Sequence, residues 1–359
     1  MEEQLKFLTE KGLRPIEYIV EKCNQNDVIL LGEDHRVREN LKFVTSLIPH
    51  LYVNGVYTLG LEFGAEEDQE ALDHLVIADQ YDPLEARRIL RSYNLAWAYK
   101  EYLDIYYEVW KWNRSLPKDV RPFRILNLSY RFDWTSYHGR PSPANYARVF
   151  MRGPIDLFRA NRIQKEILDI SEKILVLTGT VHAFTTFSMP DADPFDHSFV
   201  RYERRYMGNL LADRFLHRIK TVLLHQPFWS RDAADYHAVS PGRGLVEQVL
   251  QERGNQAIGF DLNDTAMGML EDTSQYSAGK QKLRLMDLAD GYVFLQPLKK
   301  LNGCTVDTEF INGLSWEDVK MRVDCELRKR PESLFEFWEQ IRDYADLRDF
   351  YDAAANAIE

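Results

Sequence analysis

The stretch Val28-Ile-Leu-Leu-Gly-Glu-Asp-His35 joins four aliphatic residues to a glycine, two acids and a histidine. A short uninterrupted aliphatic run is typical of a parallel strand buried between two layers of helices. Gly32 permits a sharp turn where the run ends. Because ligands of open α/β sheets bind beyond the carboxyl ends of the strands, the polar residues that follow should face a binding site. The stretch therefore predicts an α/β fold and the edge of the sheet at which its chemistry takes place.

Six more β-rich apolar runs follow, and segments with helical periodicity separate them. The runs cover residues 56–62, 123–128, 174–179, 221–226, 257–262 and 292–297. Helical periodicity is clearest in residues 40–52, 145–170 and 204–219. This alternation predicts an α/β fold of three layers, with a mostly parallel central sheet and helices on both faces.

The connection between the second and third runs, about 60 residues long, is too long for a plain crossover. We expect a helical insertion at about 64–121. One of its faces carries Tyr99, Tyr102, Leu103, Tyr106 and Trp110. This face either packs on the sheet or forms a lid on which Trp97 and Tyr102 contact a substrate. Residues 1–314 are expected to form one α/β catalytic-type domain, and residues 315–359 a charged helical extension packed on it.

The charge balance excludes nucleic acid as the primary partner. The chain has 359 residues, with 45 Lys and Arg against 56 Asp and Glu, and its net charge of −11 opposes binding to phosphates. No apolar stretch approaches the ~18 residues of a membrane span, and the acidic N-terminus does not resemble a signal peptide. The three cysteines, in no CxxC spacing, indicate neither a disulfide framework nor a thiolate zinc site. We expect a cytoplasmic protein that binds neither nucleic acid nor membrane.

Acids and histidines stand at the ends of three expected strands. Glu33 and His35 follow the first, Glu62 ends the second, and His182 comes three residues after Gly179. A spacing of two residues in extended chain points Glu33 and His35 to the same side. A carboxylate beside an imidazole can act as an oriented general base, or the two can bind a divalent metal. We predict that the four residues converge in one pocket as catalytic groups, although each alone is compatible with a structural role.

Arg131 follows the third run and is a candidate substrate-binding residue. It would clamp a carboxylate or an oxyanion, and the competing interpretation is a surface salt bridge. No serine stands in a GxSxG elbow, and neither GxxxxGK(S/T) nor GxGxxG follows a strand, so a serine-hydrolase triad and a nucleotide cradle are not indicated. The 7 Trp, 19 Tyr and 19 Phe favour a small-molecule substrate that is bulky and partly apolar.

These motifs resemble the superfamily of erythromycin esterases, ChaN-type haem-binding proteins and Tiki/TraB proteins. The likeness lies in GEDH at 32–35, LGLEF at 59–63, GTVH at 179–182, and MGNLLADRF followed by KTVLLHQ at 207–226. In the insertion, WAYKE at 97–101 and WKWN at 110–113 are similar to a signature of the esterase branch, whereas the spacing in GEDH is closer to the ChaN and Tiki/TraB form. The resemblance covers residues 27–226 and implies that Glu33, His35, Glu62 and His182 are the shared active-site residues.

The residues and the resemblance together predict a hydrolase of an ester, lactone or amide. His35 would activate water with Glu33 or Glu62 orienting it, and His182, assisted by Arg131, would stabilise the oxyanion. This version needs no cofactor. In a second version Glu33, His35, Glu62 and His182 hold a divalent metal, Zn, Mn or Co, whose bound water attacks. The non-enzymatic alternative is a protein that binds haem or another flat apolar ligand through a His or Tyr.

Overall fold

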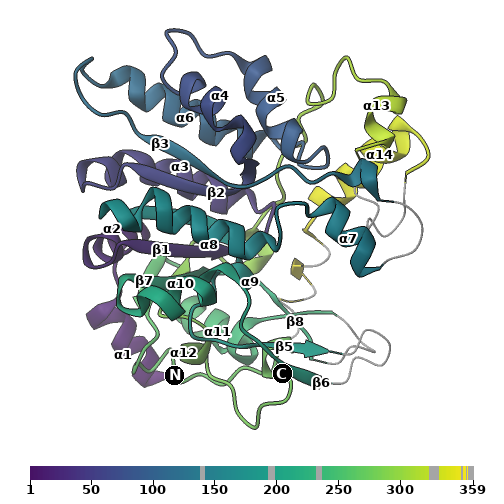
Figure 1. Ribbon diagram of the computed structural model, residues 1–359. Coiled ribbons are helices and arrows are strands. Elements are labelled where there is room, and N and C mark those ends of the chain that lie inside the picture. The colour runs from purple at the N-terminus through teal and green to yellow at the C-terminus, as the bar shows by residue number, and fades with distance from the viewer. Residues whose placement is uncertain are drawn as a thin grey trace.

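The central sheet has seven strands and contains all seven predicted runs (Figure 1). The computed structural model describes residues 1–137, 142–192, 199–231, 237–322, 331–348, 351, 352 and 354. The strands are β1 (Val28–Glu33), β2 (Thr58–Ala65), β3 (Arg124–Ser129), β4 (Ile174–Gly179), β7 (Ile219–Leu224), β10 (Ile258–Asp261) and β11 (Gly291–Phe294). Their order is β10-β11-β7-β1-β4-β2-β3, and all pairings are parallel except that of β10 with β11. The predicted α/β fold with a mostly parallel sheet is confirmed.

Alternate side chains of the strands face different helical layers. Ile29 and Leu31 of β1 lie in a core shared with helices α2 and α3, whereas Val28 and Leu30 lie in a core shared with α8 and α10. These helices are α2 (Pro15–Gln25), α3 (Arg38–Val53), α8 (Ile155–Glu166) and α10 (Met207–Phe215). Figure 1 shows α8 and α10 in front of the sheet. Both faces of the sheet are covered, which explains why its strands read as continuous apolar runs.

A separate core surrounds β10 and β11 at one edge of the sheet. The helices that contribute to it are α1 (Glu2–Lys11), α11 (Leu245–Glu252) and α12 (Leu285–Leu288). Several shorter elements lie outside the central sheet. They are the antiparallel pairs β5 (Met189–Ala192) with β6 (Phe199–Glu203) and β8 (Phe228–Trp229) with β9 (Ala238–Val239), helix α9 (Thr180–Ala183), and the 3-10 turns η2 (Trp134–Ser136), η6 (Pro241–Gly244), η7 (Gln275–Ser277) and η8 (Leu298–Lys300).

The insertion between β2 and β3 is helical. It contains η1 (Glu66–Asp68), α4 (Gln69–Leu75), α5 (Pro83–Tyr93) and α6 (Lys100–Ser115). The aromatic face of α6 is buried in the core that α2 and α3 share with the sheet, and it packs against α3. Most of the aromatic residues on this face therefore pack in the core, which is the first of the two interpretations. Glu101 accepts hydrogen bonds from N and Oγ1 of Thr305 at 2.8 and 2.9 Å. Asn113 exchanges two hydrogen bonds with the backbone of Phe123, and the polar residues of the WAYKE and WKWN motifs thereby attach the insertion to the domain.

The periodic segment 145–170 forms more than one helix. Helix α7 (Pro143–Val149) ends before Gly153 and Pro154, α8 begins at Ile155, and η3 (Leu168–Ile170) follows. Gly153 has a φ of +85°, and proline has no N–H with which to continue a helix. The segment 204–219 likewise forms α10 and the turn η4 (Leu216–Arg218). Both segments are helical, as predicted, and each of them is divided into more than one helical element.

The C-terminal residues pack on the loop after β1. Helices α13 (Trp316–Lys320) and α14 (Leu334–Ala345) each begin after a serine that caps the helix. Tyr351 donates a hydrogen bond to Asp34, and the guanidinium of Arg36 lies 3.6 Å from the ring centroid of Tyr344. Residues 323–330, 349, 350, 353 and 355–359 of the expected extension lie outside the described part of the chain.

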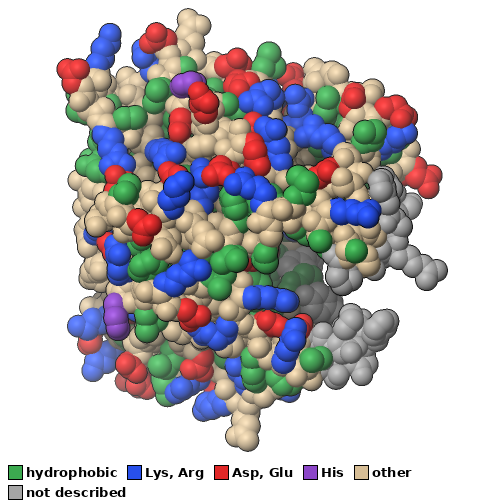
Figure 2. All heavy atoms as spheres, viewed as in Figure 1, with side chains coloured by type: hydrophobic (Ala, Val, Ile, Leu, Met, Phe, Trp, Pro, Cys, Tyr) green, Lys and Arg blue, Asp and Glu red, His purple; other side chains and the backbone are tan. Residues whose placement is uncertain are grey.

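Basic and acidic side chains are interspersed over the face that carries α8 and α10, as Figure 2 shows. Cys23 and Cys304 are buried free thiols, and Cys325 lies outside the described residues. None of the helices in the described segments combines the length and the apolar character that crossing a bilayer requires.

Candidate active site

Glu33, His35, Glu62 and His182 lie together at the carboxyl ends of three neighbouring strands. Glu33 ends β1, Glu62 lies in β2, and His182 is in α9 directly after β4, which runs between the other two. Nδ1 of His35 is 3.2 Å from Oε1 of Glu33. Nε2 of His182 is 3.5 Å from Oε1 of Glu62. Two pairs of imidazole and carboxylate therefore share one edge of the sheet.

Gly179, the last residue of β4, touches both pairs. A Cβ built at this position would lie 2.9 Å from Nε2 of His35 and 3.5 Å from Cδ2 of His182, so both rings pack against the glycine. Its N–H also donates to Oε2 of Glu62 at 2.8 Å. Its φ of −57° and ψ of 145° suit any residue. The glycine is therefore needed for space and not for an unusual backbone.

Buried aromatic side chains hold the pair of Glu33 and His35. The hydroxyl of Tyr102 donates to Oε1 of Glu33 at 3.3 Å. The ring of His35 contacts Phe63 and Trp97 at centroid distances of 4.7 and 5.6 Å. Within the described part of the chain, no group hydrogen bonds to Nε2 of His35, and 27% of this side chain is exposed. The pair leaves one ring nitrogen free for water or substrate.

The loop that carries His35 is constrained from two sides. Arg36 has a φ of 71°, a left-handed conformation that costs free energy in a residue with a Cβ. Its N–H donates to the hydroxyl of Tyr102 at 3.3 Å, and its guanidinium donates to the carbonyl of Tyr344. The insertion and the C-terminal helix therefore both hold this conformation in place.

Glu62 lies in a buried network of hydrogen-bond donors. Its Oε2 accepts from Oγ1 of Thr178 at 2.7 Å as well as from Gly179, and its Oε1 is 3.1 Å from Nη2 of Arg159. Nδ1 of His182 is 2.7 Å from Oδ1 of Asp156. The imidazole of His182 is thus held between two carboxylates, and the buried Arg159 lies within ion-pair distance of both, at 3.1 Å from Glu62 and 4.0 Å from Asp156.

The surroundings lower the pKa of Glu62 and raise the pKa values of Glu33 and His35. Burial opposes ionisation of Glu62, but Arg159, His182 and His35 outweigh it and hold the pKa of Glu62 far below its ordinary value. Burial raises the pKa of Glu33, and His35 compensates only in part. Burial also opposes protonation of His35, yet its hydrogen bond to Glu33 and the charges of Glu62 and Glu33 raise the pKa of His35 above its ordinary value.

Arg159 and Asp156, both on α8, were not predicted from the sequence. Arg159 is four residues from both Ile155 and Ile163, so it shares the apolar face of the helix. An arginine on such a face is costly unless it is paired, and this position was the available signal. Asp156 gives no comparable signal, because acids are common in the first turn of a helix.

Arg131 pairs with Asp68 and not with Glu62 or His182. Its Nη2 is 2.7 Å from Oδ1 of Asp68, and its Nε is 3.2 Å from Oδ2. This contact matches the interpretation of Arg131 as a salt bridge, and the position beside Glu62 belongs to Arg159. A role for Arg131 in substrate binding stays a prediction.

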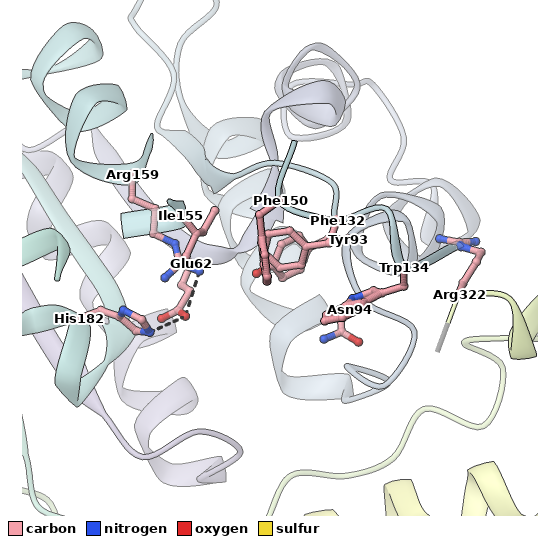
Figure 3. A pocket seen from close by; sticks show the side chains of 10 residues that line it. All are labelled: Glu62, Tyr93, Asn94, Phe132, Trp134, Phe150, Ile155, Arg159, His182 and Arg322. Atoms are coloured by element: carbon pink, nitrogen blue, oxygen red, sulfur yellow. Dashed lines mark ion pairs between the residues drawn. The ribbon is translucent and has the colours of Figure 1, made fainter. Parts of the chain in front are cut away.

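Two cavities meet at His182. The larger, of about 250 Å³, is lined at one end by Glu62, Arg159 and His182 (Figure 3). Its outer part is lined by Tyr93, Asn94, Phe132, Trp134, Phe150 and Arg322. The smaller, of about 190 Å³, is lined by Glu33, His35, Gly179 and His182, together with Gln226, Trp229 and Tyr276. Trp97 and Tyr102 are buried beside His35 and Glu33, so their predicted contact with substrate stays a prediction.

Two of the four predicted metal ligands, Glu62 and His182, have no free donor atom for a metal ion. Both carboxylate oxygens of Glu62 and both ring nitrogens of His182 already have partners, and one of these partners is the guanidinium of Arg159. Across the described ranges, no group of three or more His, Cys, Asp or Glu side chains is arranged to hold a metal. The arrangement favours the version of the chemistry that uses only protein groups.

Three solved structures share the architecture of this chain. A mutant of erythromycin esterase EreC in its open conformation matches with a TM-score of 0.53 and 11% identity, over 83% of this chain and 99% of that chain. The fold of this chain is similar to that of this esterase. A succinoglycan biosynthesis protein shares this fold with a TM-score of 0.53 and 12% identity, over 82% of this chain and 96% of that chain. A Bacillus cereus protein matches with a TM-score of 0.51 and 11% identity, over 85% of this chain and 98% of that chain.

The likeness to the erythromycin esterase fold confirms the predicted resemblance at the level of structure. The sequence itself matches no protein-family model and no curated protein. The shared fold places the residues after β1, β2 and β4 at one edge of the sheet, and it leaves the reaction to be argued from these residues.

Proposed function

We propose that this chain is a hydrolase that cleaves an ester, lactone or amide bond held between the two cavities. The proposal rests on the way in which the imidazole of His35 is held. Glu33 fixes its Nδ1, its Nε2 has no hydrogen-bond partner among the described residues, and its side chain lines a cavity that His182 also lines. An imidazole held at one nitrogen by a carboxylate and open at the other is arranged for general-base catalysis.

His35 is the proposed base. With Nδ1–H donated to Glu33, the lone pair is on Nε2, which takes a proton from the attacking water. Glu33 then stabilises the imidazolium that forms. Phe63 and Trp97 contact the ring of His35 and restrict its rotation, which keeps the ring in one orientation beside Glu33.

Arg159 and His182 are the proposed oxyanion stabilisers. Nη1 of Arg159 is buried without a hydrogen-bond partner among the described residues, and the side chain lines the larger cavity. Asp156 and Glu62 orient His182 beside it. Positive charge fixed before the reaction stabilises the oxygen on which negative charge develops. Arg159 is placed beside Glu62 for this role, whereas Arg131 is paired with Asp68.

The aromatic lining of the larger cavity supports a bulky, partly apolar small-molecule substrate. The erythromycin esterase that shares the fold supports esters and lactones as the first classes to test. A suitable panel contains nitrophenyl esters, aromatic lactones and anilides, each assayed with EDTA and with added Zn, Mn or Co. We expect turnover of at least one class that EDTA does not reduce.

Two results of this panel would contradict the proposal. One is the absence of turnover for every class in a protein that is folded by circular dichroism. The other is activity that depends entirely on an added metal. A Soret band after addition of haem, in a protein without turnover, would favour the alternative of a haem-binding protein.

A further inference from the structure

The larger cavity leads away from Glu62 and His182 along a wall of aromatic rings. Phe132 contacts Tyr93 and Phe150 at centroid distances of 5.6 and 5.1 Å, and Trp134 contacts Phe150 at 5.9 Å. Figure 3 shows these rings between Glu62 and His182 at one end and Arg322 at the other. A ligand that fills the cavity therefore meets apolar rings and then a guanidinium.

Arg322 belongs to a group of four arginines from three separate parts of the chain. The group consists of Arg88 and Arg91 on α5, Arg131 after β3, and Arg322 after α13. Nη2 of Arg322 donates to the backbone carbonyl of Arg91 at 2.8 Å. Burial lowers the pKa of Arg322, and the charges of Arg91 and Arg131 lower it further. Arg322 therefore lies beside other positive charges at this end of the cavity.

Acidic residues neutralise only part of this group. Arg88 and Arg131 share the carboxylate of Asp68 at 3.1 and 2.7 Å, and Arg88 also pairs with Glu85. These contacts balance two of the four charges.

The other two arginines donate to backbone carbonyls. Arg91 donates to the carbonyl of Phe310 at 3.4 Å, and neither Arg91 nor Arg322 has a carboxylate within ion-pair distance among the described residues. Asp318 acts on Arg322 from α13, but its carboxylate accepts the hydrogen bonds of Ser315 at the start of that helix. Among the described residues, no carboxylate is paired with Arg91 or Arg322 at this end of the cavity, and their positive charge is available to an anionic ligand.

We propose that the larger cavity binds an anion with a flat apolar body, such as an aromatic carboxylate, sulfonate or phosphate. The anionic group pairs with Arg322 and the body lies against Phe132, Trp134 and Phe150. Planar guanidinium groups bind such oxyanions through charge-assisted hydrogen bonds, and apolar rings contribute stacking and burial. The expectation that the scissile bond of this anion lies at Glu62 and His182 rests on the proposed function, whereas the binding does not.

Two fluorescent probes with the same rings test the binding. Anilinonaphthalene sulfonate carries an anionic group, and N-phenylnaphthylamine lacks it. In titrations of the full chain, Arg322→Ala should weaken binding of the sulfonate roughly tenfold and leave binding of the neutral probe unchanged. Arg322→Lys should recover part of the affinity. Arg14→Ala, which removes one exposed charge at the start of α2, is the matched control and should change neither affinity.

Equal affinity of wild type and Arg322→Ala for the sulfonate would overturn the proposal, as would an equal loss for both probes. The readout needs no turnover. A chain that hydrolyses nothing can still bind the anion at Arg322, and a hydrolase can fail this test, so the two proposals fail separately.

Discussion

Nη2 of Arg159 lies 3.1 Å from Oε1 of Glu62, and both side chains are buried at the carboxyl edge of the sheet. The two residues come from α8 and β2, on different layers of the fold. Removal of one partner of a buried pair leaves an uncompensated charge in a region of low dielectric constant. The pair therefore contributes to the fold and also fixes the charge beside His182.

Arg159→Met should lower the free energy of unfolding by about 3–5 kcal/mol at pH 7. The folded pKa of Glu62 is depressed, so the stabilisation from its ionised form is present above the unfolded pKa of about 4.3 and declines as the pH falls below it. The difference between wild type and variant should therefore narrow below about pH 4. Urea unfolding at several pH values measures it. The control is Arg121→Met, which breaks an exposed pair with Glu172 and should lower the free energy of unfolding by less than about 1 kcal/mol. An equal loss of stability in the two variants would show that the buried pair is unimportant.

The pH dependence of kcat/KM should report the environment of His35. Protonated His35 cannot act as a base. Burial lowers the pKa of His35, but Glu33 and Glu62 raise it by more, so the pKa lies above its ordinary value. The acidic limb of the pH profile of kcat/KM should therefore lie above about pH 6.5. Glu33→Gln removes one source of this shift and should move the limb to lower pH. If the acidic limb of Glu33→Gln stayed at the wild-type pH, the group that titrates would not be His35 paired with Glu33.

Gly179→Ala should reduce kcat roughly 10- to 100-fold, because the new Cβ would lie 2.9 Å from Nε2 of His35 and displace the ring. The backbone at this position suits alanine, so the melting temperature should stay close to that of wild type. Steady-state kinetics and thermal unfolding of the same preparation measure both quantities. Wild-type activity in the variant would place the ring of His35 elsewhere during catalysis.

Tyr351→Phe removes the hydrogen bond between the C-terminal segment and Asp34, next to His35. We expect a loss of stability of about 1 kcal/mol and a several-fold loss of kcat with little change in KM, because the loop that carries His35 loses one anchor. Tyr107→Phe, at an exposed position on α6, is the control and should change neither. A change in KM alone would indicate contact with substrate and not positioning of the loop.

The sheet and the four central residues could be predicted because the information is local. In β1, Val28 to Leu31 are all buried, so the strand reads as one apolar run, and the residues after it fall at the ligand edge. The break between α7 and α8 has a local cause as well, because a glycine and a proline follow one another at 153 and 154. Contacts between distant segments leave no comparable signal.

Arg159 shows why part of the site could not be predicted. Its partner Glu62 is on another element, and only the packing of α8 on the sheet decides that the two meet. The contact of Tyr351 with Asp34 depends in the same way on where the C-terminal segment lies. Trp97 and Tyr102 were predicted to be near the site and are near it, but their burial beside His35 depends on how the insertion packs against α3.

The most direct measurement of the central claim is the turnover of His35→Ala beside His74→Ala on the best substrate of the panel. His74 is exposed on α4 and serves as the matched control. We expect kcat/KM of His35→Ala to fall by about 100-fold or more, with an unchanged unfolding transition and unchanged activity of His74→Ala. Wild-type turnover in a folded His35→Ala protein would contradict the assignment of His35 as the base.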